Sequence, residues 1–595
     1  MVYIDARWQR CRVVRNSAII TFSWKTKWMH ARSHIEIKKM VGRHLDRSSS
    51  VHASIVAVLI MALAIELYVF ARVQDIWLDE STQLSGITLD FWEMLRWLAG
   101  ADPDRLGVPG DRMPPVSYLL DWLWLHFCGP AEMGFRLFHS AFVIAGVSGL
   151  AIVTLRELGP LATIVSLGFL VLSPKLIQTG VEIRAYPIFF AITCAQAAVF
   201  IQLMACRPKL EPKLLTIFTA ICLASIYTHF YGVVSSCAFF LALGISFLGR
   251  TVALAEIIGA FLIMAVGSLA LIPIVSAAGR VLPFVPVTAT IPTAVEKEAA
   301  VRYLTYLLQL IGDPANMISI SASILFFVGS IAVLAVNIFA AVMNVRNRNV
   351  KPFDLLIAVV LSGVFVTITA SFFVRTFDAM NASYSGWLLV PLSLLVGAGA
   401  NTVTGLRSWD AAGKKVAVGA MLAGAGISTY MFLVHAPMFV HGPHRFIGAL
   451  YDKAATPKAI VYEAGAAWGW VYIPLVYSRN SEVVQYRASD DRSGLVRAGP
   501  TGTETVIQKI EAAVAPYQVL LLADIRLRTY QDLRQCQNRS SACPDFHSGA
   551  IKGALIGTGK WRETGKERSF GHYDAQVTIL ERVSGHALPH FIRNQ

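Results

Sequence analysis

Charged residues are scarce in this sequence of 595 residues, of which only 15% are Asp, Glu, Lys or Arg, while 55% are hydrophobic. Such a composition excludes an ordinary soluble enzyme and indicates a membrane protein with many spans. The sequence also lacks a P-loop, a GxGxxG fingerprint and a GxSxG elbow. No motif therefore indicates nucleotide binding or a serine hydrolase.

Cysteine is also scarce, and the eight cysteines show no metal-ligand spacing. Five of them fall in apolar segments, where a small core-filling side chain is the expected role: Cys128, Cys194, Cys206, Cys222 and Cys237. Cys536 and Cys543 lie in the polar C-terminal region, where a short disulfide loop could form if that region is extracytoplasmic.

The N-terminal tail, residues 1–50, carries eleven Lys and Arg against three acids. Basic residues before a first span stay in the cytoplasm, so the span that begins at residue 51 is predicted to run outward. Nucleic-acid binding is the rival interpretation, but topology explains the charge and we expect no nucleic-acid partner. We expect no cleavable signal peptide, because the apolar run starts late and lacks a small-residue cleavage pattern.

Twelve apolar segments between residues 51 and 435 approach the roughly 20 residues that cross a bilayer. They are 51–70, 114–129, 136–155, 159–174, 186–206, 213–230, 232–249, 253–276, 317–343, 354–374, 384–405 and 415–435. An even number would return the C-terminal region to the cytoplasm, whereas the basic residues after 343 and 405 place it outside. The sequence therefore predicts eleven or thirteen spans, with 114–129 and 159–174 as the weakest segments.

The fold class expected is a mainly α polytopic membrane protein with a C-terminal soluble α/β domain. Residues 51–435 form the membrane domain, with external loops at 71–113 and 277–316. Residues 436–595 are richer in charge and contain strand-like runs such as 459–462 and 519–523, so we expect them to form an extracytoplasmic domain.

The first external loop contains an amphipathic stretch, residues 89–98, whose apolar residues recur at spacings of three and four. This pattern predicts a helix in the membrane interface, with Trp92 and Trp97 as headgroup anchors. The next span is preceded by Arg112 and two prolines, a pattern that also suits a simple helix start.

Polar groups in or beside spans are costly to keep there and mark candidate functional sites. Asp79 and Glu80 follow the first span. An exposed acidic turn at a helix end, without any functional role, would give the same sequence pattern. Glu182 and Arg184 lie between two apolar segments, and we expect them on the same side of the membrane as Asp79. A simple surface ion pair is the alternative to a functional role. His229 is flanked by aromatic residues, and a packed structural histidine is more common than a metal ligand in such a place.

The order of these motifs resembles the polyprenyl-phosphate-sugar-dependent glycosyltransferases of the GT-C class, in the branch of family 39, the protein O-mannosyltransferases and the aminoarabinose transferases. The matching stretches are 76–81, 114–120, Glu132 with 136–141, 172–174, 182–186 and 227–232. This sequence departs from the family pattern late in the chain, where members of the family often have an arginine-tyrosine pair. Here Tyr384 takes the tyrosine's place but follows Ser383.

The resemblance implies an inverting transferase that moves a sugar from a polyprenyl-phosphate donor to a glycan, a lipid-linked glycan or a protein hydroxyl at the outer face of the plasma membrane. It implies Asp79 as the general base, with Glu80 positioning the acceptor or joining Asp79 around a divalent cation such as Mg²⁺ or Mn²⁺. Arg184, Arg280 and Arg302 would bind the donor phosphate. The substrate contacts would be Glu182, Tyr186, His229, Tyr231 and Tyr384.

A transporter or flippase of lipid-linked saccharides is the alternative, since it would also use many spans and a few intramembrane charges. It would need neither a paired acid at the outer end of a span nor a large C-terminal domain.

Overall fold

The structure is a computed structural model, and its described residues fall in two parts of the chain. In the helical part they are 31–76, 78–101, 113–248, 250–281, 354–373 and 383–405, with a few isolated positions up to 430. In the C-terminal part they are 444–454, 458–463, 485–487, 508, 511–512, 514–527, 550–569 and 573–583. Several predictions lie outside these residues, namely those on Arg112, Arg302, Cys536 and Cys543 and most of the segments 317–343 and 415–435. The side chains of Asp79 and Arg280 also lie outside the description.

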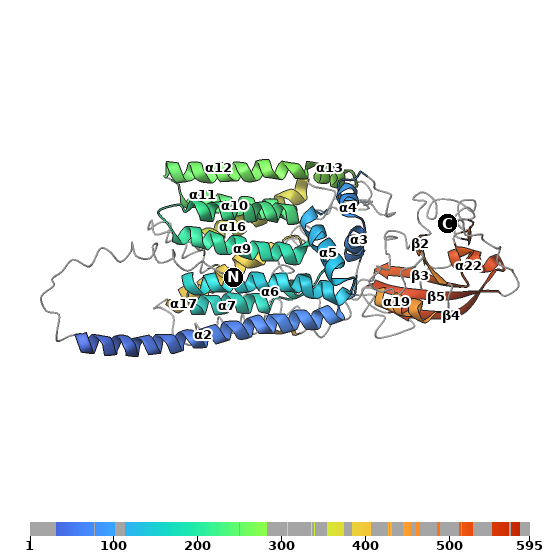
Figure 1. The fold of residues 1–595 in the computed structure, drawn as a ribbon, viewed down its shortest axis with the longest axis horizontal. Helices are drawn as coiled ribbons and strands as arrows, with labels where there is room; N and C mark the ends of the chain where they lie inside the picture. Colours follow the sequence, from blue (N-terminus) through green and yellow to red (C-terminus); the bar gives the residue numbers. More distant parts are fainter. Residues whose placement is uncertain are drawn as a thin grey trace.

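A bundle of long helices forms the body of the protein (Figure 1). Its elements are α2 (Ala31–Val73), α6 (Glu132–Glu157), α7 (Pro160–Val171), α8 (Pro174–Gly180), α9 (Ala185–Ala205), α10 (Pro212–Thr228), α11 (Tyr231–Ser246), α12 (Thr251–Ser268), η1 (Leu269–Leu271), α13 (Ile272–Val281), α16 (Asp354–Phe373), η3 (Gly386–Leu388) and α17 (Leu389–Gly405). Proline opens α7, α8 and α10, because its missing N–H costs no hydrogen bond in a first helical turn.

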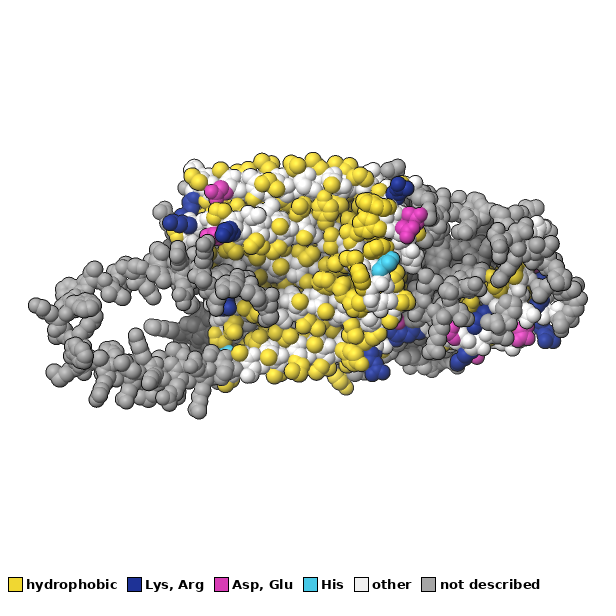
Figure 2. Space-filling model, viewed as in Figure 1, with side chains coloured by type: hydrophobic (Ala, Val, Ile, Leu, Met, Phe, Trp, Pro, Cys, Tyr) yellow, Lys and Arg dark blue, Asp and Glu magenta, His cyan; other side chains and the backbone are white. Residues whose placement is uncertain are grey.

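The bundle has the surface of an integral membrane protein. Four helical segments, 51–73, 132–157, 185–205 and 251–277, are long and apolar enough to cross a membrane, and α7 with α8 is a fifth candidate, bent by 64°. Figure 2 shows hydrophobic side chains over the visible face of the bundle, with charged side chains toward its two ends. This arrangement confirms the expected mainly α membrane fold.

Three short helices lie at the end of the bundle beside the C-terminal domain: α3 (Leu78–Gly86), α4 (Phe91–Leu98) and α5 (Pro115–Cys128) (Figure 1). Segment 114–129, one of the two weakest predicted spans, is α5, which is not among the described helices that are long and apolar enough to cross a membrane. Its Tyr118 packs edge-on against Trp97 of α4 at 6.0 Å, and its last turn leads into the start of α6, where Arg136 binds Glu80 of α3. Both ends of α5 therefore lie at one end of the bundle, which argues against counting it as a span.

Two details of this end differ from the sequence predictions. The expected interfacial helix exists as α4, with Trp92 69% exposed, but Trp97 is 0% exposed and cannot anchor in lipid headgroups. It packs on Tyr118, because the apolar face of α4 lies against α5 rather than against lipid. Cys128, expected to fill the core, is exposed at the end of α5, whereas Cys194 and Cys222 are buried as expected.

The two ends of the bundle differ in charge. Turns at one end carry basic residues, namely Arg156, Arg207, Lys209, Lys213 and Arg250, and Arg250 donates to the Pro208 carbonyl across two of these turns. The other end carries both signs of charge, with Glu80, Glu132 and Glu182 beside Arg136, Arg184 and Lys175. There the amide of Ile183 donates to Glu80 at 2.8 Å. The expectation that Glu182 and Arg184 share a side with Asp79 is thereby confirmed.

The C-terminal part contains a five-stranded mixed sheet in the order β2-β1-β3-β5-β4. Its strands are β1 (Lys458–Glu463), β2 (Gln485–Arg487), β3 (Val519–Leu527), β4 (Trp561–Ser569) and β5 (Tyr573–Arg582), with β1 parallel to β2 and β3 and the other pairs antiparallel. Alternate residues of a strand point to opposite faces, so Leu522 packs with Leu555 of α22 (Ala550–Gly557), and Leu521 packs with Ile447 of α19 (His444–Lys453). The strands expected at 459–462 and 519–523 are therefore confirmed.

Candidate functional site

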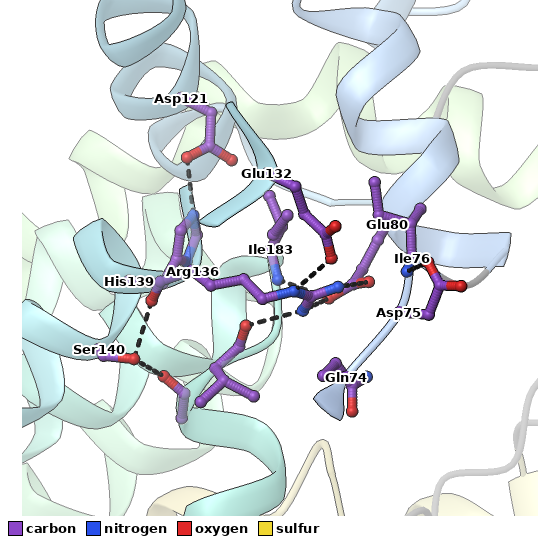
Figure 3. Close-up of polar contacts among 12 residues, drawn as sticks. Gln74, Asp75, Ile76, Glu80, Asp121, Glu132, Arg136, His139, Ser140 and Ile183 are labelled. Carbon is purple, nitrogen blue, oxygen red and sulfur yellow. Dashed lines mark hydrogen bonds and ion pairs between the residues drawn. The ribbon is translucent and has the colours of Figure 1, made fainter. Parts of the chain in front are cut away.

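A fully buried ion pair joins the start of α3 to the start of α6 (Figure 3). The two terminal nitrogens of Arg136 donate to the two carboxylate oxygens of Glu80, at 2.9 and 3.1 Å, and both side chains are 0% exposed. The amide of Ile183 donates to the same carboxylate. Glu80 therefore holds together α3, α6 and the turn between α8 and α9.

Arg136 has further acceptors that complete its surroundings. Its Nε donates to Glu132 one turn earlier at 2.7 Å, and a terminal nitrogen donates to the Val181 carbonyl at 3.1 Å. A buried guanidinium needs such partners, because an unpaired charge is costly in a medium of low dielectric constant. The pair is thus a fixed part of the structure.

The hydrogen-bond donors around Glu80 test whether this carboxylate could bind the divalent cation expected from the sequence. Both Glu80 oxygens accept hydrogen bonds from Arg136, whereas a cation ligand must turn its lone pairs toward the metal. Among the residues that the structure describes, no group of three or more His, Cys, Asp or Glu could hold a metal ion. Glu80 does not fit the role of a cation ligand.

A second buried contact holds α3 one turn further along. Asp121 of α5 lies 2.7 Å from Nε2 of His139, and the side-chain amide of Gln83 donates to the other oxygen of Asp121. All three side chains are buried. Positions three apart share a helix face, so Glu80 and Gln83 hold α3 at two points. The backbone of Asp79, in the first turn of α3, is fixed by these contacts.

Four of the residues predicted to contact substrate come together around one imidazole. The ring centroid of His229 lies 5.5 Å from that of Tyr186, 5.8 Å from Tyr231 and 5.8 Å from Tyr384, and Phe189 stacks on it at 5.1 Å. These residues come from α9, from the turn before α11 and its first residue, and from the turn before η3. The folded chain thereby builds an aromatic cluster at the end of the bundle that also carries Glu80.

His229 offers a hydrogen-bond donor within this cluster. Its Nδ1 accepts from the Tyr231 amide at 3.0 Å, so the proton of the neutral ring lies on Nε2. Nε2 is buried, and no hydrogen-bond partner for it lies among the described residues. A bound hydroxyl oxygen could accept from it.

Lys175 brings a further buried cation to the same region, and the sequence interpretation missed it. Its Nζ donates to the hydroxyl of Ser383 at 2.7 Å and to Gln178 at 3.3 Å. Ser383 directly precedes Tyr384, while Glu182 and Arg184 lie on the turn after α8 and are each 3% exposed. A lysine directly after Ser173-Pro174 in an apolar stretch was the available signal.

Two predicted phosphate-binding arginines and two residues without a predicted role complete the comparison with the sequence predictions. Arg280 lies in the last turn of α13, and Arg302 is outside the described residues. Arg136 and Glu132 belong to a stretch that matches the family resemblance, but the sequence assigned them no role. The partner of Arg136 stands 56 positions earlier in the chain, which no local pattern reveals.

Comparisons with known proteins agree with this arrangement at the level of the fold. No protein-family model and no curated protein matches the sequence. The structure of ArnT from Cupriavidus metallidurans in the apo state is similar, with a TM-score of 0.53 and 12% identity over 91% of this chain and 100% of that one. The same protein bound to undecaprenyl phosphate gives a TM-score of 0.51 and 12% identity over 90% and 99%. At this identity the likeness concerns the fold, and the chain has the fold of the GT-C glycosyltransferases.

Proposed function

We propose that the protein is an inverting glycosyltransferase that moves a sugar from a polyprenyl-phosphate donor to a hydroxyl of a glycan, a lipid-linked glycan or a protein. The observation that carries this proposal is the buried contact of Glu80 with Arg136 and the Ile183 amide. It fixes the first turn of α3, and with it the backbone of Asp79, beside the turn of Glu182 and Arg184. The fold shared with ArnT supports the same function.

Asp79 is the general base in this proposal. Its carboxylate takes the proton of the acceptor hydroxyl, whose oxygen forms the new bond to the anomeric carbon while the bond from that carbon to the phosphate oxygen breaks. The phosphate leaves with the bonding electrons, and attack from the opposite face inverts the anomeric configuration. Glu80 does not touch substrate and acts by holding Asp79 in place.

Buried cations would stabilise the leaving phosphate. Arg184 is the first candidate, because it is buried and directly precedes α9, whose Tyr186 belongs to the aromatic cluster. Lys175 is a second candidate, because it contacts Ser383 next to Tyr384. Arg280 and Arg302 are proposed from the sequence alone. Positive groups fixed in a dry site stabilise charge that develops in the transition state. ArnT was captured with undecaprenyl phosphate, which supports a lipid phosphate as the leaving group.

The aromatic cluster would bind the sugar. The rings of Tyr186, Tyr231 and Tyr384 offer apolar faces for the C–H side of a pyranose, and Nε2 of His229 offers a donor to a hydroxyl. Glu182 would accept from another sugar hydroxyl. The lipid-linked donor carries the energy of the reaction, and the lipid tail would lie in the bilayer beside the bundle. We place this site at the outer face of the plasma membrane, with the basic tail inside.

The test is the substitution Asp79→Asn in purified protein supplied with polyprenyl-phosphate sugars. We expect sugar transfer to slow by at least about 100-fold, because general-base catalysis contributes that much. Asp90→Asn is the matched control, since Asp90 is exposed on the same loop and should leave the rate unchanged. Undiminished transfer by the Asp79→Asn protein would refute the assignment of the base. Movement of lipid-linked saccharide across vesicles without any transfer would favour the transporter alternative.

A further inference from the structure

One residue of the C-terminal domain reaches into the polar end of the helix bundle. Arg445, in the first turn of α19, donates through Nε and a terminal nitrogen to both carboxylate oxygens of Glu132, at 3.1 and 3.0 Å. The same guanidinium donates to the carbonyls of Arg72 and Gln74, at 2.8 and 2.6 Å. Arg445 therefore joins the end of α2 to the start of α6.

The backbone of Arg445 makes a separate contact with the segment between α2 and α3. Its amide donates to Asp75, at 3.0 Å to one oxygen and 3.4 Å to the other. The first amides of a helix have no acceptor within the helix, so a carboxylate from another element can satisfy one of them. Asp75, which is 3% exposed, also accepts from the Ile76 amide at 2.7 Å (Figure 3). Residues 74–76 are thus held against α19.

The contacts of Arg445 continue to the candidate base through shared carboxylates. Glu132 accepts from both Arg445 and Arg136, and Arg136 holds Glu80, the neighbour of Asp79. Glu132 therefore bridges the guanidinium groups of Arg445 and Arg136, while Asp75 accepts from the backbone amide of Arg445. Without the Arg445 side chain, the link from Glu132 to the carbonyls of Arg72 and Gln74 would be lost.

We infer that Arg445 is a positioning residue through which docking of the C-terminal domain orders residues 74–76 and the start of α3. The catalytic meaning of this inference rests on the proposed function, because it is Asp79 whose position is set. The ordering of α3 itself does not depend on which reaction the protein catalyses.

The experiment compares the full-length wild-type protein with Arg445→Ala, Arg445→Lys and Lys453→Ala. Lys453 is exposed at the other end of α19 and serves as the matched control. The first measurement is hydrogen exchange of the α3 amides. We expect exchange about tenfold faster in Arg445→Ala, since local opening becomes easier when anchoring contacts are lost. Arg445→Lys keeps the charge without the two-pronged geometry and should fall between, while Lys453→Ala should match the wild type.

The second measurement is the rate of sugar transfer. A misplaced base lowers kcat, and we expect a loss of about tenfold or more in Arg445→Ala with the donor KM unchanged. Thermal unfolding of each variant shows whether this loss exceeds any general loss of stability.

The outcomes are separable. Unchanged exchange in α3 of the Arg445→Ala protein overturns the inference whatever its activity, and faster exchange with an unchanged kcat overturns the positioning role. If the wild type transfers no sugar from any polyprenyl-phosphate donor supplied, the proposed function fails and the exchange measurement alone decides the inference. If Arg445→Ala yields no folded protein, Arg445→Lys is judged by the same two criteria.

Discussion

At the scale of single residues, the contacts of Glu80, the neighbour of Asp79, are those of a structural support. The carboxylate of Glu80 is fully buried and accepts three hydrogen bonds, from Arg136 and the Ile183 amide. Both oxygens of this carboxylate accept from buried donors, so Glu80 could not turn toward an acceptor hydroxyl without breaking these bonds. These contacts support the proposed division of roles, with Asp79 as the base and Glu80 as its support.

Replacing Glu80 by Gln tests the structural half of this division. The amide has nearly the same shape, but it leaves Arg136 with the Glu132 carboxylate as its remaining charged partner among the contacts described above. Removing one partner of a buried ion pair destabilises a protein by roughly 3–5 kcal/mol, so we expect a clearly lower unfolding temperature in detergent. Glu256→Gln, at an exposed position of α12, is the control and should unfold as the wild type does. Equal unfolding temperatures for both variants would contradict the role given to Glu80.

The residues of the candidate site were predictable to different degrees. His229 stood out as a polar group beside apolar segments, whereas the roles of Tyr186, Tyr231 and Tyr384 were implied by the family resemblance. The structure brings the four together. Arg136 was not assigned a role, because an arginine near the start of an apolar segment is equally typical of a headgroup anchor. Only the folded chain shows that it is buried.

At the scale of elements, hydropathy located most helices but misjudged α5. The segment is apolar and of nearly sufficient length, yet it contains Asp121, which would be costly inside lipid. That charge is accommodated by His139 of α6 and Gln83 of α3. Such tertiary compensation is invisible in a hydropathy pattern, which is why a weak span and a buried helix look alike.

The turn that carries His229 depends on a close contact between α10 and α11. A Cβ atom added to Gly232 would lie 2.2 Å from the Ser225 carbonyl oxygen, so Gly232→Ala must push the two helices apart. We expect a loss of stability of about 1–3 kcal/mol, as for other overpacked sites, together with weaker substrate binding. Thermal unfolding and KM for the donor are the measurements.

Gly244→Ala is the control for that substitution, because it lies in the same helix with nothing within 4 Å of the added atom. Alanine favours helix more than glycine does, so this variant should be at least as stable as the wild type. If the two variants behaved alike, the close approach at Gly232 would have no consequence for the turn.

At the scale of the whole molecule, α3, α4, α5 and the C-terminal domain share one end of the bundle, and the basic turns occupy the other (Figure 1). The positive-inside rule then predicts that the end with Glu80 faces outward. Cysteine labelling tests this orientation in a background without native cysteines. Position 88, exposed in the first loop, should react with an impermeant maleimide on intact cells, and position 209 only after permeabilisation. The reverse pattern would place the site in the cytoplasm.

The contacts of Arg445 have a consequence for the order in which the protein is made. Arg445 lies 370 positions after Asp75 and 313 after Glu132, beyond the helices of the bundle. A nascent chain that has inserted residues 51–405 already contains every motif of the candidate site but not the guanidinium that joins α2 to α6. Arg445, the last support of the site, is therefore synthesised only after the helices of the bundle.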